Sequence, residues 1–203
     1  MGLQLKSKTF TASTANNTSI HALATLGGAG NFPSLTTAAG DGSYNGTNVA
    51  SKITLTSAGN LASVNFTVTG TDVNGDAQSE SITGLNANTI STTKFYRTVT
   101  QVAADAAVGT NTSIGNSADA SGVIFAGRTR VRGAHGTSGA TVGTIDFLDG
   151  SSAGTSKFSF LTATTTADYI EPYIPDDGIL FKNGAYVDLP GGVAGSLTAF
   201  FDG

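Results

Sequence analysis

Three of the four arginines in the chain lie within five residues of one another, at Arg128, Arg130 and Arg132. They occupy alternate positions of the segment FAGRTRVRG, and alternate residues of a β-strand point to the same face of a sheet. Arginine is well suited to bidentate pairing with carboxylates at interfaces. We therefore predict that this arginine cluster forms an interface stripe that docks on carboxylates; a solvated sheet face is the alternative.

The charges are divided unequally along the chain. Residues 1–141 carry a net charge of +2 and residues 142–203 a net charge of −6, which together give the formal net charge of −4. The acidic C-terminal part is thus a source of partners for the arginine cluster. The pairing could occur within one chain or between copies that associate front to back, and the charge pattern leaves both open.

Groups that could transfer protons are scarce. The two histidines, His21 and His135, lie far apart in glycine-rich stretches, which favours surface roles. The acidic pairs at 146/149 and 176/177 have the residue type that a glycosidase needs, but each lies near a glycine where aspartate is favoured in turns. We predict that the protein is not an enzyme and has no catalytic residues.

Metal, cofactor and nucleic-acid sites are not indicated either. Residues 72–76 begin like a calcium loop, but Ala77 stands where the turn glycine belongs and Thr83 where the bidentate glutamate belongs. Cysteine is absent, so no thiolate metal site can form. A net charge of −4 does not suit phosphate recognition. We predict no metal, no cofactor and no nucleic-acid partner.

The composition points to a protein with covered surfaces. Charged residues make up 12% of the chain, about half of the roughly 25% usual for soluble domains. Free monomers generally rely on mixed surface charge for solubility, so neutral hydroxyls and amides suit faces that neighbours cover. An exposed surface that tolerates neutral polar residues is the alternative. No apolar run approaches the roughly 20 residues that span a bilayer, so no membrane partner is predicted.

The chain reads as β-structure throughout. In residues 64–84, Val64, Phe66 and Val68 alternate with polar residues, and Asn74-Gly75 then supplies a tight turn before a return strand. This is the pattern of a β-hairpin, with Asn74-Gly75 expected at the central positions of its turn. No window has a convincing helical period.

The hairpin carries a resemblance to a known class of proteins. The segment FTVTGTDVNGDAQSESI, followed by KFYRTV, is similar to a β-module of small virion proteins of tailed bacteriophages. The closing segment GILFKNGAYV resembles the C-terminal hairpin of the same kind of protein. The resemblance implies a virion structural protein located in the phage particle. Capsid decoration (cement) is the preferred role; a neck or tail component and a receptor- or glycan-binding tip protein are the alternatives.

The predicted fold is all-β, with two antiparallel β-sandwich or jelly-roll-like modules at 1–116 and 117–203 and negligible helix. Within the first module, residues 11–50 are rich in glycine and asparagine and are expected to hold short strands or to form an arm on another subunit. Residues 116–122 read as a linker. The second module is expected to contain seven short strands, at 123–133, 141–148, 157–162, 168–174, 179–181, 185–189 and 196–201.

These expectations combine into an assembly hypothesis. The low charge and the expected arm favour a homo-oligomer, with a trimer as the first choice. The arginine cluster would then dock on a neighbouring subunit, on the major capsid protein or on another virion protein.

Overall fold

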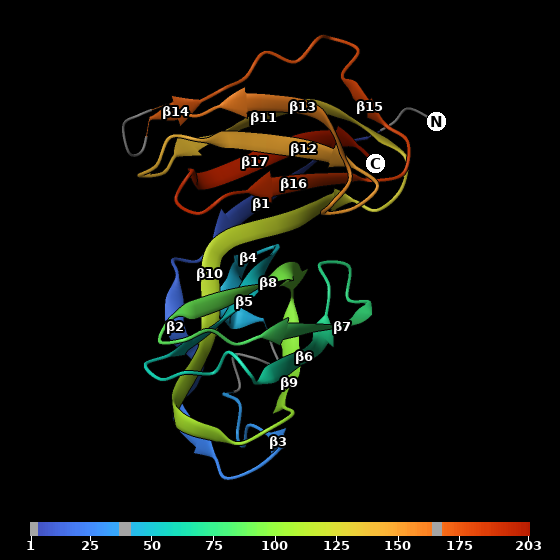
Figure 1. Ribbon diagram of the computed structural model, residues 1–203. Helices are drawn as coiled ribbons and strands as arrows, with labels where there is room; N and C mark the ends of the chain where they lie inside the picture. The colour runs from blue at the N-terminus through green and yellow to red at the C-terminus, as the bar shows by residue number, and fades with distance from the viewer. Residues whose placement is uncertain (1–3, 37–41, 164–167) are drawn as a thin grey trace. The chain divides into compact units, whose positions relative to one another are not determined.

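The computed structural model describes residues 4–36, 42–163 and 168–203, and in this part of the chain the structure is almost entirely β (Figure 1). The only helical element among the described residues is the 3-10 turn η1 (Ser43–Asn45). The all-β prediction is therefore confirmed. The strands are β1 (Leu5–Ala12), β2 (Asn16–Leu26), β3 (Gly30–Asn31), β4 (Gly46–Thr47), β5 (Val49–Ser57), β6 (Asn65–Thr71), β7 (Ala77–Thr83), β8 (Thr89–Tyr96), β9 (Thr98–Ala104), β10 (Val108–Phe125), β11 (Thr129–Ser138), β12 (Thr144–Asp149), β13 (Thr155–Leu161), β14 (Tyr169–Ile170), β15 (Ile179–Phe181), β16 (Ala185–Leu189) and β17 (Ala194–Asp202).

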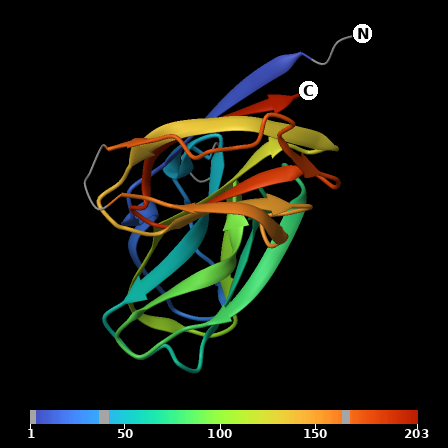
Figure 2. The same ribbon diagram turned by 90° about the horizontal axis from the view of Figure 1, so that it is seen from above.

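The chain divides into two compact units whose boundaries differ from the predicted ones. Unit 1 comprises Met1–Thr14, Gly46–Val49 and Asp119–Gly203, and unit 2 comprises Ala15–Asn45 and Ala50–Ala118. The first strand belongs to unit 1 because β1 pairs antiparallel with β17, from Leu5 opposite Asp202 to Phe10 opposite Leu197. Figure 2 shows the start of β1 beside the end of β17. The composition of the chain does not reveal pairing between distant segments. The predicted boundary therefore followed the order of residues along the chain alone.

Unit 1 is a β-sandwich. One sheet has the order β14-β11-β17-β1-β4, with β15 also paired to β11, and the facing layer contains β13, β12, β16 and the end of β10. Alternate residues of each strand point inward, as the two-residue period requires. The resulting core includes Phe10, Val131, Phe147, Phe181, Val187, Leu197 and Phe201, all at most 5% exposed.

Unit 2 has its own core. Strands β3, β9, β6 and β7 form one sheet in this order, while β5 pairs with β8 and the first part of β10 pairs with β2. The buried side chains of this unit form a separate cluster that includes Ile20, Ile53, Phe66, Val68, Tyr96, Val102 and Ile114.

The predicted hairpin is present, with a different turn. β6 and β7 pair in register from Asn65 opposite Thr83 to Thr71 opposite Ala77. The amide of Gly75 donates to the carbonyl of Asp72 at 3.1 Å, so the central positions of the turn are Val73 and Asn74. Gly75 follows at φ +93°, the left-handed residue that completes a three-residue hairpin loop.

The residues expected to form a linker are instead inside the 18-residue strand β10, which contributes to both units. Small residues are required here because neighbouring segments approach closely. A side chain at Gly115 would overlap the backbone of Asn16, and one at Gly122 would overlap the ring of Phe10. Within the predicted linker, Ser121 and Gly122 are thus buried packing residues of a strand.

The segment 11–50 is likewise built into the fold, as far as it is described; residues 37–41 of it lie outside the described residues. The predicted short strands are the better of the two alternatives, because β2 runs for 11 residues and pairs with β10, from Asn16 opposite Asn116 to Leu26 opposite Val108. Its register with β10 shifts three times, and this irregularity explains why the sequence shows no clean alternation.

Candidate functional site

The three arginines do not form a regular stripe on one strand. Arg128 is exposed in the bend that precedes β11, whereas Arg130 and Arg132 lie on β11 itself. The pairing of β11 with β17 shifts between Val131 and Gly133, which makes Arg132 the extra residue of a β-bulge. Bulges break the strict alternation of side chains and re-aim them, so the predicted common face does not extend over all three residues.

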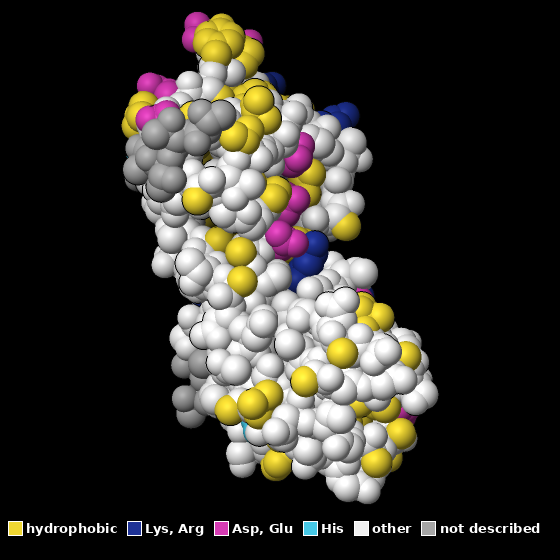
Figure 3. Space-filling model, turned by 60° about the vertical axis from the view of Figure 1, so that its left-hand side comes forward, with side chains coloured by type: hydrophobic (Ala, Val, Ile, Leu, Met, Phe, Trp, Pro, Cys, Tyr) yellow, Lys and Arg dark blue, Asp and Glu magenta, His cyan; other side chains and the backbone are white. Residues whose placement is uncertain are grey.

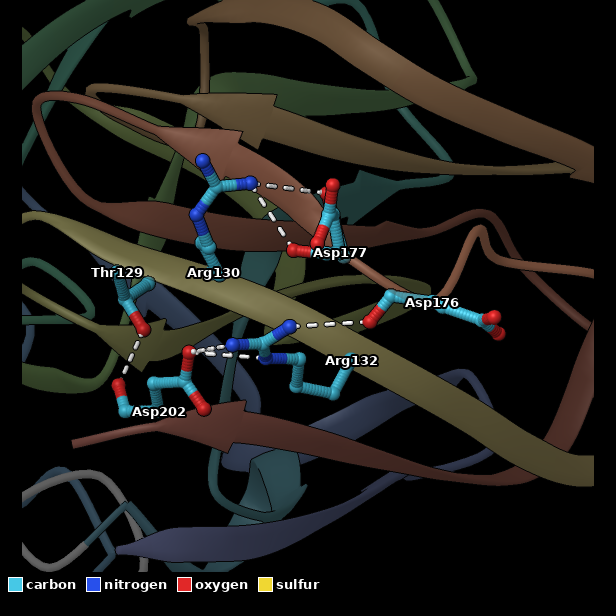
Figure 4. Close-up of polar contacts among 7 residues, drawn as sticks. Thr129, Arg130, Arg132, Asp176, Asp177 and Asp202 are labelled. Carbon is cyan, nitrogen blue, oxygen red and sulfur yellow. Dashed lines mark hydrogen bonds and ion pairs between the residues drawn. The ribbon is translucent and has the colours of Figure 1, made fainter. Parts of the chain in front are cut away.

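Arg132 is held by a carboxylate of its own unit (Figure 4). Its Nε and Nη2 atoms each lie 2.9 Å from Oδ2 of Asp202, and its Nη1 donates to the carbonyl of Asp176 at 3.0 Å. Asp202 is only 8% exposed, and its carbonyl accepts a hydrogen bond from the hydroxyl of Thr129. The pairing of this arginine with the acidic C-terminal part therefore occurs within the chain.

The side chain of Arg130 binds the backbone of the same loop. Its Nη1 donates to the carbonyls of Asp177 and Gly178, at 2.9 Å and 3.2 Å. The loop is closed by a turn in which the amide of Gly178 donates to the carbonyl of Pro175 at 2.7 Å. Arg130 and Arg132 together thus hold the loop between β14 and β15 by its backbone oxygens (Figure 4). An interface role of Arg128, Arg130 and Arg132 stays a prediction, and of these Arg128 is the exposed one.

His135 stands farther along β11 in a stack of aromatic rings. Its ring centroid lies 5.4 Å from that of Phe200 on β17 and 6.0 Å from that of Tyr169 on β14, with interplanar angles of 29° and 24°. Tyr169 is 66% exposed, so the stack reaches the surface. The other histidine, His21, packs edge-on against Phe32 in unit 2. The two histidines therefore pack against aromatic rings of different units.

Beside this stack the surface of unit 1 is hollowed. The hollow has a volume of about 420 Å³, and its lining residues are Arg132, Gly133, Ala134, His135, Glu171, Pro172, Tyr173, Ile174 and Phe200. A second hollow of about 350 Å³ lies next to it and shares Glu171 and Pro172. Tyr173 is 82% exposed. This site was not predicted from the sequence, although the segment DYIEPYI places two tyrosines, a glutamate and a proline within a few residues.

The outer face of the same sheet is rich in hydroxyl groups. We call Ser7, Thr9, Thr137, Ser196 and Thr198 the hydroxyl face; they lie on β1, β11 and β17, on the side opposite to the core residues Phe10, Leu197 and Ala199. Thr9 and Thr198 share a hydrogen bond of 2.8 Å across the strands, and Thr137 and Ser196 share one of 3.4 Å. This face therefore presents neutral polar groups over three neighbouring strands.

Two of the aspartates considered for catalysis, Asp146 and Asp149, accept hydrogen bonds from a side chain and from a backbone amide. Oδ1 of Asp146 accepts from the hydroxyl of Ser156 at 2.7 Å, and Oδ1 of Asp149 accepts from the amide of Asn183 at 2.8 Å. Over the described ranges, no three histidine, cysteine or acidic side chains are grouped so that they could hold a metal ion. In the same ranges no helix is long and apolar enough to cross a membrane.

In unit 2, carboxylates accept hydrogen bonds from backbone amides. Oδ1 of Asp72 accepts from the amides of Asn74 and Asp76, so the segment that resembles a calcium loop is closed by its own backbone. Asp105 accepts from the side chain and the amide of Asn65, at 2.7 Å and 2.8 Å, and these bonds hold the pKa of its carboxyl below the usual value. Burial raises the pKa values of the phenols of Tyr44 and Tyr96.

Comparison of the chain with protein-family models, with curated proteins and with solved structures gives no match.

Proposed function

We propose that this protein is a non-enzymatic structural component of a tailed-phage particle, a capsid decoration (cement) protein that attaches through the hydroxyl face of unit 1. The single observation that carries the proposal is that face: neutral hydroxyl side chains on three neighbouring strands, β1, β11 and β17, of a six-stranded sheet. Such a surface can be covered by a partner without leaving charges unpaired, whose burial would be costly.

One side of the surface fits the same role. Figure 3 shows one side of the molecule, on which uncharged polar groups and backbone predominate and charged side chains are few. The resemblance of the hairpin at 64–84 to modules of virion proteins points in the same direction. The proposed partners are the major capsid protein and further copies of this chain, with a trimer favoured.

The number of copies in purified particles is the first test. Quantitative mass spectrometry should find hundreds of copies per particle if the protein decorates the head. A dozen copies or fewer would instead indicate a neck, tail or tip component, and absence from particles would overturn the proposal. Light scattering of the isolated protein tests the trimer, and a monomer that attaches one copy at a time would contradict it.

A matched pair of variants tests the attachment face. Thr9→Glu introduces a charge at an exposed strand position of the hydroxyl face, and Thr67→Glu does so at an exposed strand position of β6 in unit 2. Thr9→Glu should reduce attachment to particles that lack the protein, while Thr67→Glu should not. Equal attachment of both variants would contradict docking through this face. Thermal unfolding of both should stay close to the parent, because surface substitutions usually change stability by less than about 0.5 kcal/mol.

A further inference from the structure

The hollow beside His135 lies at a gap in the strand pairing of β11. On one edge β11 pairs with β17; on the other edge β15 pairs with Thr129, Arg130 and Val131, and β14 pairs with Gly136 and Thr137. Between these two short strands, no strand of the described chain is assigned beside residues 132–135 on that edge. The hollow of about 420 Å³ lies along this four-residue gap, and the segment that joins β14 to β15 forms its other side.

The gap is closed at both ends. An extended peptide that added itself to β11 would meet β15 in one direction and β14 in the other, since both occupy the same edge. Strand addition by a partner protein requires a longer open edge. The occupant of the hollow must therefore be compact, and the volume falls in the usual range of about 300–1,000 Å³ for small-molecule sites.

Aromatic rings and polar groups line the hollow together. His135 and Phe200 stack on each other at 5.4 Å, and Tyr173, 82% exposed, stands in the segment that faces them. Tyrosine combines a rigid apolar face with a hydroxyl group that can donate and accept. Glu171 adds an exposed carboxylate, which accepts hydrogen bonds.

The charges in the hollow disfavour an anionic ligand. The guanidinium of Arg132 is already paired with Asp202 at 2.9 Å and with the carbonyl of Asp176. Its positive charge is thus offset inside the protein, while Glu171 contributes a negative charge. A phosphate or a carboxylated ligand would meet repulsion, whereas a neutral ligand rich in hydroxyl groups would find acceptors and ring faces.

We propose that this hollow binds a neutral sugar residue, with Tyr173 stacking on the apolar face of the ring and Glu171 accepting hydrogen bonds from its hydroxyls. The second hollow, which shares Glu171 and includes the exposed Tyr169, offers room for the next sugar of a chain. The hollow borders the hydroxyl face, since His135 is paired with Thr198 and Phe200 with Ser7, but sugar binding by the isolated protein does not require attachment to a capsid.

The protein is tested on an array of neutral and sialylated glycans, and the best neutral monosaccharide is then titrated in solution. Tyrosine fluorescence reports binding directly, because the chain has no tryptophan and three of its five tyrosines, Tyr44, Tyr96 and Tyr186, are at most 5% exposed. We expect neutral glycans to bind and sialylated ones to be excluded. Tyr173→Ala should weaken the affinity by about tenfold or more, since it removes the stacking ring. Glu171→Gln should weaken it by about three- to tenfold.

Leu23→Ala is the control, because Leu23 is 63% exposed and belongs to unit 2; its affinity should equal that of the parent. Absence of binding to every glycan of the array would overturn the proposal. Preference for sialylated glycans, or an affinity that Tyr173→Ala leaves unchanged, would overturn it as well. Failure to attach to particles would contradict the proposed capsid role alone and would leave the sugar titration unaffected.

Discussion

Charged side chains bond backbone groups in both units, but arginines hold one loop of unit 1 whereas carboxylates hold a turn and a strand of unit 2. In unit 1, Arg130 and Arg132 donate hydrogen bonds to backbone carbonyls of the loop between β14 and β15. In unit 2, Asp72 accepts hydrogen bonds from backbone amides of the turn between β6 and β7, and Glu80 accepts them from amides inside β8, where its register with β5 shifts. In both units a charged side chain holds a segment that lacks a complete ladder of its own. A chain with 12% charged residues thus commits much of its charge to its own backbone.

This difference teaches why charge patterns alone are a poor guide to interfaces here. The opposite-charge partner that we predicted for the arginines from the sequence is present for Arg132 as Asp202. Two other acidic residues of the same part, Asp176 and Asp177, serve through their carbonyl oxygens. Any residue type could supply those oxygens, so the sequence gives no sign of them.

The largest effect is expected for Arg132→Ala in unit 1. The substitution leaves the buried carboxylate of Asp202 without its cation and releases the carbonyl of Asp176. Because Arg132 itself is one-third exposed, we expect the free energy of unfolding to fall by about 2–3 kcal/mol rather than the full cost of breaking a buried pair. Urea unfolding measures the loss, and hydrogen exchange should assign it to unit 1. Arg128→Ala, in the exposed bend, is the control. An equal loss of unfolding free energy in both variants would mean that the bonds of Arg132 to Asp202 and Asp176 do not stabilise unit 1.

A smaller effect is expected for Glu80→Gln in unit 2. One oxygen of Glu80 accepts from the amide and the hydroxyl of Thr93, at 2.8 Å and 2.9 Å, and the other accepts from the amide of Lys94 at 2.9 Å. Glutamine keeps the shape but turns one acceptor into a donor, so we expect a loss of about 1–2 kcal/mol in urea unfolding. Asp76→Asn, at an exposed position of the nearby loop, is the matched control. A Glu80→Gln variant as stable as the parent would mean that these amides are equally well served by water.

The smallest effect is a pH dependence in unit 2. The pKa of Asp105 is lowered in the folded state, first by the side chain and then by the amide of Asn65, so its carboxylate stabilises the fold above the ordinary pKa and loses this contribution as the pH falls through the folded value. The parent should therefore exceed Asp105→Asn in stability at pH 6, and the difference should shrink below about pH 4. A difference that stays constant with pH would assign the effect to packing rather than to the charge.

Much of the fold could be predicted from the sequence because alternation is a local property. The hairpin of β6 and β7 was recognised from its apolar period and its turn residues, and the expected strands at 179–181 and 185–189 coincide with β15 and β16. Tyr169 begins a much shorter strand than expected, since Pro172 has no amide hydrogen to donate to a ladder.

The missed features all depend on distant parts of the chain. The small residues of β10 read as a linker, and only the closeness of Asn16 and Phe10 explains them. The bulge at Arg132 arises from the pairing of β11 with β17, which is separated from it by many residues. The hollow beside His135 exists because two short strands leave a gap on one edge of β11. None of these relations has a signature within a short window of sequence.

The pairing of β1 with β17 sets an order of events during synthesis. Unit 2 ends at Ala118, so it can fold while the ribosome is still making the rest of the chain. β1 emerges before unit 2 yet must wait for β17, and at roughly 5–20 residues per second the interval between Ala118 and Asp202 lasts several seconds. During this time the edge of β1 is open to the nascent chains of neighbouring ribosomes. Exchange of β1 between copies is therefore the misassembly to which this chain is most exposed.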